Sequence, residues 1–291
     1  MRRAATACRL IVVAILLMTA SSAAGPAVQV AAHRGGAALW PENSLTAFRN
    51  AIALGARILE LDVHLTADGA VAVIHDPTLE RTSSGRGPIA ACTAADLRRA
   101  RLRGPDGALT DDWVPTLDEV LALAAPSGTA LLVEVKTPAP AVRYERRGDR
   151  VTAVPGPRYP GLEGKVLDLL RATGVAERTF VMAFNPAVLV EVRLRAPQQS
   201  TTLLVDRRHV EESGATPVET VAWATEARAS FLGLHYSLCD AAVVEAAHRA
   251  KIGVGVFTVN DEPTMRRLAG LGVDVIISDR ADLVARLQAE G

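Results

Sequence analysis

The stretch ILELDVHLTADGAVAVIHD, from Ile58 to Asp76, decides which folds the chain can adopt. It consists of two apolar, strand-like runs joined by a turn at Asp68-Gly69. The first run carries Glu60 and Asp62 in a segment that is otherwise apolar, and the second run closes on His75. Residues two apart on a strand point to the same side, so the two carboxylates project together. Because two carboxylates 4 Å apart repel by roughly 4 kcal/mol at an effective dielectric constant of 20, this pair needs a proton, a basic side chain or a divalent cation beside it.

Apolar runs of this kind recur from end to end of the chain and alternate with amphipathic helical stretches. Most of them do not alternate polar and apolar residues, which is typical of strands buried on both faces of a parallel sheet. Repeated strand–helix units in 291 residues predict an α/β fold, a single (β/α)8 TIM barrel, for which about 250 residues are typical. Nine strands compete for the eight places, so one of them is accessory or wrong. The predicted strands are Val28–Ala32, Ile58–Asp62, Val71–His75, Ala130–Val135, Phe180–Ala183, Thr202–Val205, Phe231–Leu234, Gly253–Val259 and Val273–Ile277.

The predicted helices lie between most of these strands, and two longer irregular stretches interrupt the alternation. Glu80 to Pro115 and Thr137 to Pro160 both follow strand ends. The loops that follow the strands of a parallel barrel cover its C-terminal face, where such barrels carry their chemistry, so both long stretches are expected there. The predicted helices are Ser44–Ala53, Thr116–Ala124, Leu162–Ala172, Pro186–Arg195, Pro217–Ala227, Ala241–Lys251, Glu262–Leu271 and Ala281–Gln288.

The amino-terminal residues form a separate unit. Arg2 and Arg3 precede an apolar stretch from Leu10 to Ala20, and Ser22-Ala23-Ala24 offers small residues for cleavage. This pattern predicts a signal peptide over residues 1–24 and a single domain over residues 25–291, and hence a secreted protein without a stable membrane span in its mature form. The apolar stretch is shorter than the roughly 20 residues of a membrane span, although an uncleaved anchor is an open alternative.

Charge and cysteine content limit the partners of the chain. The 32 basic residues balance the 32 acidic ones, and no long basic tract is present, so neither nucleic acid nor an anionic membrane is an expected partner. An oxidising destination would permit a disulfide between Cys92 and Cys239, but two separate thiols fit the sequence about as well. The sequence does not indicate an oligomeric state.

A third acid repeats the position of the first two. The run ALLVEVK, from Ala130 to Lys136, ends an apolar strand on Glu134 and Lys136, again two residues apart. Three acidic oxygen donors at strand ends, Glu60, Asp62 and Glu134, suit a hard divalent cation such as Ca2+ or Mg2+. The alternative for the pair on the first strand is that both carboxylates are simply solvated. Lys136 is one of three lysines in an arginine-rich chain, and its compact charge suits contact with a phosphate oxygen or with metal-bound carboxylates.

Histidines end two further strands. His33 and Arg34 stand in the run VAAHRGG, and His75 ends the run VAVIH. Two imidazoles that converge on a metal-bound anion can act as general acid and general base, each worth roughly 10^2 to 10^4 in rate. A single histidine at a strand end is more often structural. The combination with three acids and two cations at equivalent positions favours a catalytic interpretation.

Six motifs, in one order, together resemble the glycerophosphodiester phosphodiesterase family. They are AHRGGAALWPENSLTAF, LELDVHLTADGAVAVIHDPTLERTSSGRG, VPTLDEVL, LLVEVK, FTVND and GVDVIISDR. The resemblance extends from about Val28 to Arg280, nearly all of the chain after the predicted signal peptide. It implies a TIM barrel enzyme whose metal-dependent site cleaves a small-molecule glycerophosphodiester to glycerol 3-phosphate and an alcohol.

The resemblance also implies roles for individual residues. It gives a divalent cation to Glu60, Asp62 and Glu134, and acid/base catalysis to His33 and His75. Arg34 and Lys136 would neutralise the phosphate, and Phe257 is a candidate for substrate binding. In this family the glycerol hydroxyl of the substrate is thought to attack phosphorus, which gives a cyclic phosphate that water then opens. No protein nucleophile is needed for this route, and the sequence has no convincing serine or cysteine motif for one.

The chain departs from the family pattern at two positions near strand ends. Ala183-Phe184 stands where relatives usually have Ser-Phe, and Phe257 stands where they often have Trp. The usual substrate is therefore in question, and Phe184 and Phe257 either form an apolar wall or pack in the core. Two alternative functions stay open, namely a phospholipase D-like enzyme that acts on lysophospholipids and a non-catalytic binding protein on the same barrel.

Several neighbouring polar residues have more than one interpretation. Glu42 supports the metal layer or is solvated. Asp76 caps a turn or orients a catalytic imidazole, and Asp279 caps a helix or supports the site from behind. Asn43 is predicted to cap the helix that follows it. The surface is the expected place for His64, His209 and His248, and the barrel mouth is an option for His235.

Overall fold

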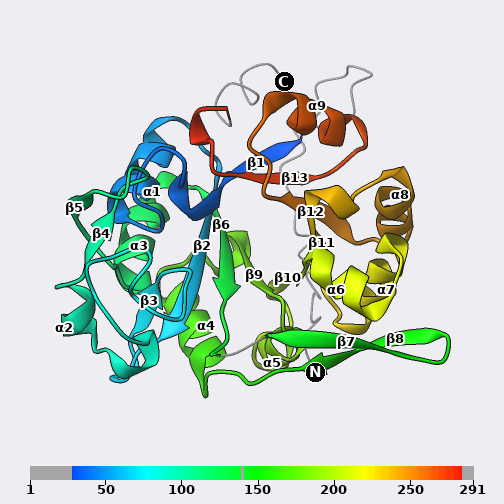
Figure 1. Ribbon diagram of the computed structural model, residues 1–291, viewed down its shortest axis with the longest axis horizontal. Helices are drawn as coiled ribbons and strands as arrows, with labels where there is room; N and C mark the ends of the chain where they lie inside the picture. The colour runs from blue at the N-terminus through cyan, green and yellow to red at the C-terminus, as the bar shows by residue number, and fades with distance from the viewer. Residues whose placement is uncertain (1–27, 139–140, 284–291) are drawn as a thin grey trace, which may run out of the picture.

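The apolar runs of the sequence pair in parallel and close into a barrel (Figure 1). The computed structural model describes residues 28–138 and 141–283. The barrel strands are β1 (Gln29–Ala32), β2 (Ile58–Leu65), β6 (Ala130–Val135), β9 (Thr179–Ala183), β10 (Ser200–Val205), β11 (Phe231–His235), β12 (Gly253–Phe257) and β13 (Val275–Ser278). Neighbours around the sheet follow the order β1-β13-β12-β11-β10-β9-β6-β2, and the parallel pairing of β1 with β2 closes the ring. The predicted (β/α)8 barrel is confirmed.

The predicted strand Val71–His75 is the accessory one. It appears as β3 (Val71–Val73), which ends two residues early and pairs antiparallel with the end of β2. A tight turn can join only antiparallel strands, because a parallel pair needs a crossover of about a dozen residues or more. The turn at Asp68-Gly69 therefore makes β2 and β3 a hairpin, and β3 takes no place in the barrel wall.

The two irregular stretches contain hairpins that the sequence analysis did not predict. In the first stretch β4 (Arg101–Arg103) pairs with β5 (Leu109–Trp113), and in the second β7 (Val142–Arg147) pairs with β8 (Arg150–Pro155). The first hairpin belongs to an excursion with its own small apolar core, which includes Leu97 and Leu102. These strands are short or carry many charged residues, so their apolar pattern is weak.

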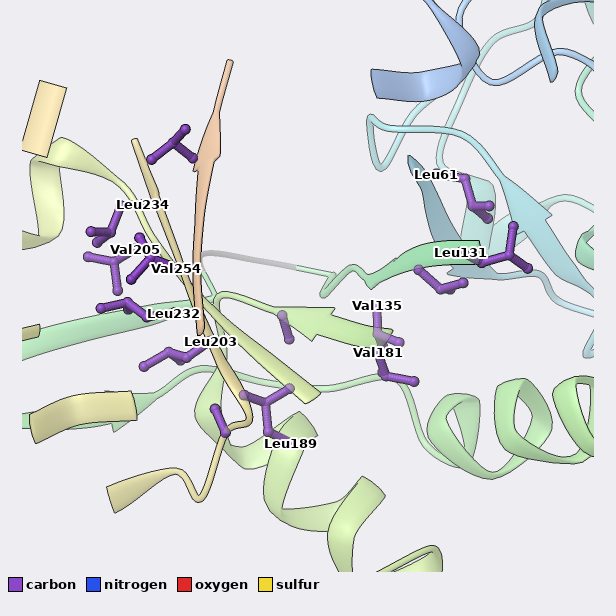
Figure 2. Close-up of a cluster of buried hydrophobic side chains, with 14 of the residues drawn as sticks. Leu61, Leu131, Val135, Val181, Leu189, Leu203, Val205, Leu232, Leu234 and Val254 are labelled. Carbon is purple, nitrogen blue, oxygen red and sulfur yellow. The ribbon is translucent and has the colours of Figure 1, made fainter. Parts of the chain in front are cut away.

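Alternate residues of the barrel strands enter two separate apolar layers. Leu203 and Val205 join the large cluster between the barrel and the helices, whereas Leu204 joins a small cluster inside the barrel. Figure 2 shows part of the outer layer, where Val205, Leu234 and Val254 of three adjacent strands lie together. Burial of both strand faces explains why the strands read as continuous apolar runs.

The helices cover the outside of the barrel and largely match the prediction. Those that were predicted are α1 (Leu45–Ala53), α3 (Leu117–Ala124), α4 (Leu162–Ala172), α5 (Pro186–Arg195), α7 (Thr220–Glu226), α8 (Ala241–Arg249) and α9 (Glu262–Gly270). The helices of the described residues that were not predicted are α2 (Ala94–Leu97), α6 (Arg207–Ser213) and the short 3-10 helices η1 (His33–Gly35), η2 (Ile89–Ala91), η3 (Ala125–Ser127), η4 (Ala176–Arg178) and η6 (Tyr236–Leu238). The 3-10 helix η5 (Pro217–Glu219) forms the start of the predicted helix Pro217–Ala227. The predicted helix Ala281–Gln288 is helical over 281–283, and the rest of it lies outside the described residues.

Two further predictions concern the ends and the cysteines of the chain. The predicted signal peptide, residues 1–24, lies outside the described residues. Among the helices that the structure describes, none combines the length and apolar character needed to cross a membrane. Cys92 and Cys239 are both buried and free, so the option of two separate thiols is the one that the structure has.

Candidate active site

Three carboxylates gather at the C-terminal end of two adjacent barrel strands. Glu60 and Asp62 alternate on β2 with residues of the outer layer, so they point into the barrel mouth, and Glu134 on β6 lies opposite Asp62 in the register. One carboxylate oxygen from each of the three lies within 4.8 Å of the others, and all three residues are buried. A buried set of oxygen donors fits a hard divalent cation. The structure thus brings the predicted metal ligands together.

Two basic side chains offset part of the repulsion in this triad. Lys136 Nζ lies 2.7 Å from Glu134 Oε1 and 2.9 Å from Asp62 Oδ1, and Arg34 Nε lies 3.4 Å from Asp62 Oδ2. Burial alone would raise the pKa of Asp62, but Lys136 and Arg34 outweigh it and hold that pKa well below its usual range. Glu60 differs, because burial and the charge of Asp62 raise its pKa. The negative charge of Glu60 is therefore only partly compensated, and a further positive charge beside it would stabilise the triad.

The segment His33–Gly35 (η1) turns sharply over the end of β1 and sets the position of Arg34. The backbone of Arg34 is left-handed, with φ 51°, and its N–H donates to Glu60 Oε2 at 3.0 Å. Gly35 follows with φ 79°, and a Cβ on it would lie 2.8 Å from Ala47 Cβ in α1. A larger residue at Gly35 would push the turn away from the helix, so glycine is required for this close approach.

Asn43 has a role that the sequence analysis assigned wrongly. It does not cap α1, because Ser44 Oγ accepts the N–H of Ala47 at 2.9 Å and is the cap. Asn43 is left-handed, with φ 58°, and its Nδ2 donates to Asp62 Oδ2 at 2.9 Å. The residue is buried and helps to fix the orientation of the Asp62 carboxylate.

His33 is held from behind by a carboxylate that directly follows the last barrel strand. Its Nδ1 lies 2.6 Å from Asp279 Oδ1, and Asn260 Nδ2 donates to Asp279 Oδ2 at 2.7 Å. Its Nε2 faces the triad, 3.8 Å from Glu60 Oε2. Burial lowers the pKa of His33, but Glu60 and Asp279 outweigh burial and raise it above the ordinary value. Asp279 therefore supports the site from behind, which is one of the two roles that the sequence left open for it.

His75 also has a carboxylate partner. Its Nδ1 lies 2.7 Å from Asp76 Oδ1, so Asp76 orients the imidazole. Burial and the charge of Lys136 lower the pKa of His75. The environments of His33 and His75 thus shift their pKa values in opposite directions, which is the arrangement expected of an acid/base pair.

Arg81 ties Asp76 to the rest of the site, and the sequence analysis did not single it out. It donates to Asp76 Oδ2 at 2.7 Å and Oδ1 at 2.9 Å, and to the two oxygens of Glu42 at 2.9 and 2.8 Å. Glu42 also accepts from Arg34 Nη1 at 3.0 Å. Glu42 is therefore ion-paired and lies outside the carboxylate triad. The only sequence signal for Arg81 is its place in the motif HDPTLERT.

His64 is buried, so its predicted surface position is wrong. Only 1% of the residue is exposed, because β2 continues to Leu65 and His64 remains inside its ladder with β3. Its Nε2 lies 3.0 Å from the carbonyl oxygen of His75, and its Nδ1 lies 3.1 Å from Tyr159 Oη. Burial lowers the pKa of His64 to about 4, so the ring is neutral near pH 7.

An aromatic rim faces this charged cluster from the strands on the other side of the mouth. The Phe257 ring meets the Phe184 ring edge-on at 5.9 Å and the His235 ring at 6.3 Å. Phe184 also lies 5.7 Å from the His209 ring, which is half-buried and so not at the open surface as predicted. Phe184 and Phe257 are half-buried and pack against the cluster inside the barrel, so core packing and an apolar wall both remain open for them. His248 is exposed as predicted.

A separate cavity lies away from these residues. It has a volume of about 400 Å³ between the β7–β8 hairpin, α5 and α7, and its lining includes Tyr144, Val190 and Trp223. None of the three carboxylates and neither His33 nor His75 lines it. The carboxylate triad and the two imidazoles therefore lie at the barrel mouth and not in this cavity, whose charged lining residues are Arg158, Glu191 and Glu226.

Comparison with known proteins agrees with this architecture. The profile of the Glycerophosphoryl diester phosphodiesterase family matches residues 33–283. A glycerophosphodiester phosphodiesterase of Caldanaerobacter subterraneus is 29% identical over 265 residues, which cover 90% of this chain and 98% of the relative. One from Bacillus altitudinis is 29% identical over 272 residues, again 90% and 98%. The crystal structure of a glycerophosphodiester phosphodiesterase from Agrobacterium tumefaciens is 25% identical, covers 89% of this chain and 99% of its own, and superposes with a TM-score of 0.70. The chain belongs to the glycerophosphoryl diester phosphodiesterase family.

Proposed function

We propose that the protein hydrolyses glycerophosphodiesters to sn-glycerol 3-phosphate and an alcohol, with a divalent cation as cofactor. The observation that carries this proposal is the pairing of two imidazoles, each backed by a carboxylate, with a buried carboxylate triad at one barrel mouth. Membership of the family gives the substrate class. The absence of a protein nucleophile in the proposed set is consistent with attack by a hydroxyl of the substrate itself.

Glu60, Asp62 and Glu134 would hold the cation, Ca2+ or Mg2+. Their donor set fits it, since all three offer buried carboxylate oxygens and the raised pKa of Glu60 marks uncompensated negative charge. When bound, such an ion supplies charge neutralisation at the phosphate and at the oxygen atoms that react there. Arg34 and Lys136 add the positive charge of the chain itself, which we assign to the phosphate oxygens.

His33 and His75 would move the protons. One imidazole accepts the proton of the attacking glycerol hydroxyl as its oxygen bonds to phosphorus, and the other donates a proton to the departing alcohol. The product of this step is a cyclic glycerol phosphate. Water then opens the ring with the two proton transfers reversed, which returns both imidazoles to their starting state. Asp279 and Asp76 keep the imidazoles oriented, since each accepts at the Nδ1 side of its ring.

The test is hydrolysis of glycerophosphocholine, followed as choline release, with and without EDTA. The wild-type protein is compared with His33→Ala, Glu60→Ala and the matched surface variant His248→Ala. We expect EDTA and both site variants to lower the rate by about 10^2-fold or more, and His248→Ala to leave it unchanged. Full activity in EDTA or in both site variants contradicts the proposed site, and no turnover of any diester favours the non-catalytic alternative.

The alcohol of the natural substrate is a separate question, on which the aromatic rim bears. The rings of Phe184 and Phe257 meet edge to face at the mouth, and such rings suit an apolar group as well as a small head group. A panel of choline, ethanolamine, inositol and glycerol diesters beside lysophospholipids separates the options. Turnover of lysophospholipids alone would replace the first proposal with the phospholipase D-like alternative.

We also propose that the protein is exported and that residues 1–24 are removed. The support is the sequence pattern alone, two arginines, an apolar stretch and small residues before Gly25. N-terminal sequencing of the protein from the culture medium should begin near residue 25. Recovery of the chain only from membranes, with its first residues intact, supports the uncleaved anchor instead.

A further inference from the structure

The backbone on both sides of His75 is tied to strand β2. The N–H of Ile74 donates to the carbonyl of Asp62 at 3.0 Å. The carbonyl of His75 itself lies 3.0 Å from His64 Nε2, and a carbonyl can only accept, so His64 Nε2 carries the hydrogen. Strand β2 thus fixes the main chain before and at the histidine that we assign to proton transfer.

Tyr159 adds a second hydrogen bond behind this contact, so that Tyr159, His64 and the carbonyl of His75 form a buried hydrogen-bonded chain. A neutral imidazole with hydrogen on Nε2 has an acceptor lone pair on Nδ1, so the Tyr159 hydroxyl donates to His64 Nδ1 across 3.1 Å. His64 is 1% exposed and Tyr159 is 7% exposed. Tyr159 comes from the segment just before α4. The hydrogen-bonded chain therefore connects a loop of the barrel mouth to the backbone of His75.

We propose that His64 is a positioning residue for His75, held in its tautomer and orientation by Tyr159. The inference rests on the proposed function, because it assigns His64 to the geometry of that site. Glu60, Asp62 and His64 follow one another at every second position of β2, so the same strand carries two metal ligands and the anchor of the imidazole. The distance between the carboxylates and the His75 ring is thereby set by one rigid element. A displacement of 1 Å at a reacting group can cost about 10^2-fold in rate.

Two substitutions at position 64 distinguish the contribution of Nε2, which contacts the carbonyl of His75, from that of Nδ1, which contacts Tyr159. In His64→Gln the amide nitrogen reaches roughly to the Nε2 position and keeps the donor to His75, whereas in His64→Asn the amide reaches only to the Nδ1 position. Tyr159→Phe keeps the ring and removes the donor to His64. The surface variant His248→Gln is the matched control. The measurements are kcat and KM for glycerophosphocholine and the thermal midpoint of each protein.

We expect His64→Asn to lower kcat by about 10- to 100-fold with KM changed less than about 3-fold. His64→Gln should recover kcat to within about 3-fold of wild type, Tyr159→Phe should fall between the two, and His248→Gln should match wild type. Equal kcat losses in the Gln and Asn variants, or a loss that appears in KM instead, overturn the inference. A drop in thermal midpoint without a drop in kcat assigns His64 a structural role only. His75→Ala keeps the two hypotheses apart, since full activity in that variant contradicts the proposed function whatever the His64 variants do.

Discussion

Lys136 is the residue whose charge holds two buried acids together. Its Nζ contacts both Asp62 and Glu134 in the buried carboxylate triad, and the side chain is 12% exposed. In Lys136→Met the two carboxylates lose this charge, so we expect the free energy of unfolding in EDTA to fall by about 3 kcal/mol. Added Ca2+ or Mg2+ should restore part of the loss, because a cation can neutralise the same oxygens. Urea unfolding with and without the cation measures this, and the exposed Lys165→Met is the control; equal losses in both media would contradict the charge argument.

Arg81 makes part of the stability at this site depend on pH. Its hydrogen bonds hold the pKa of Asp76 well below the usual range, and with Arg34 they lower the pKa of Glu42 against the effect of burial. Lowered carboxylate pKa values stabilise the fold above the unfolded values near 4, and this stabilisation is lost as the pH falls through the folded values. Arg81→Gln should therefore lower the free energy of unfolding by about 1 kcal/mol at pH 7, a small value because Arg81 is half exposed. Below pH 4 this loss should become smaller with each step toward lower pH. Urea unfolding from pH 7 to pH 3 beside Arg86→Gln checks the trend, and a cost that grows toward low pH would refute it.

The β7–β8 hairpin is a loop element that packs beside the helices α5, α6 and α7 (Figure 1). Its anchor is Tyr144, which stacks on Trp223 of α7 with ring centroids 3.8 Å apart. Tyr144→Ala removes a buried ring and should lower the free energy of unfolding by about 3 kcal/mol. Tyr144→Phe should cost little, because the hydroxyl has no hydrogen-bond partner among the described residues. Denaturant unfolding measures both variants, and a Phe variant as unstable as the Ala variant would show that the hydroxyl is the important group.

Across the whole molecule, the barrel mouth has a charged half and an aromatic half. The carboxylate triad comes from β2 and β6, and the two imidazoles come from the segments that follow β1 and β3. Phe184 follows β9, and His235 and Phe257 end β11 and β12. If Phe257 contacts the substrate, Phe257→Ala should raise KM by about 10-fold with a smaller effect on kcat. Phe257→Trp should change the ratio of kcat/KM between choline and inositol diesters. A uniform effect on all substrates would assign Phe257 to core packing alone.

The sequence predicted the barrel and the carboxylate triad because both follow from short-range patterns. Continuous apolar runs mark strands buried on both faces, and the two-residue period of a strand puts Glu60 and Asp62 on one side. Parallel strands end at the same face, so Glu134 could be added from its position alone. The hairpins of the long loops escaped prediction, because charged strands such as β7 have no continuous apolar pattern.

Only the tertiary structure decided which groups act on one another. Closure of the barrel brings β13 beside β1, so Asp279 reaches His33 although 246 positions separate them. The antiparallel return of β3 buries His64 beneath His75, and loop packing brings Tyr159 and Arg81 to their partners. By itself the sequence determined the barrel strands, most of the helices and the strand-end acids, since these depend on local spacing. The partners of each imidazole depended on how the closed sheet and its loops meet in space, which no local spacing encodes.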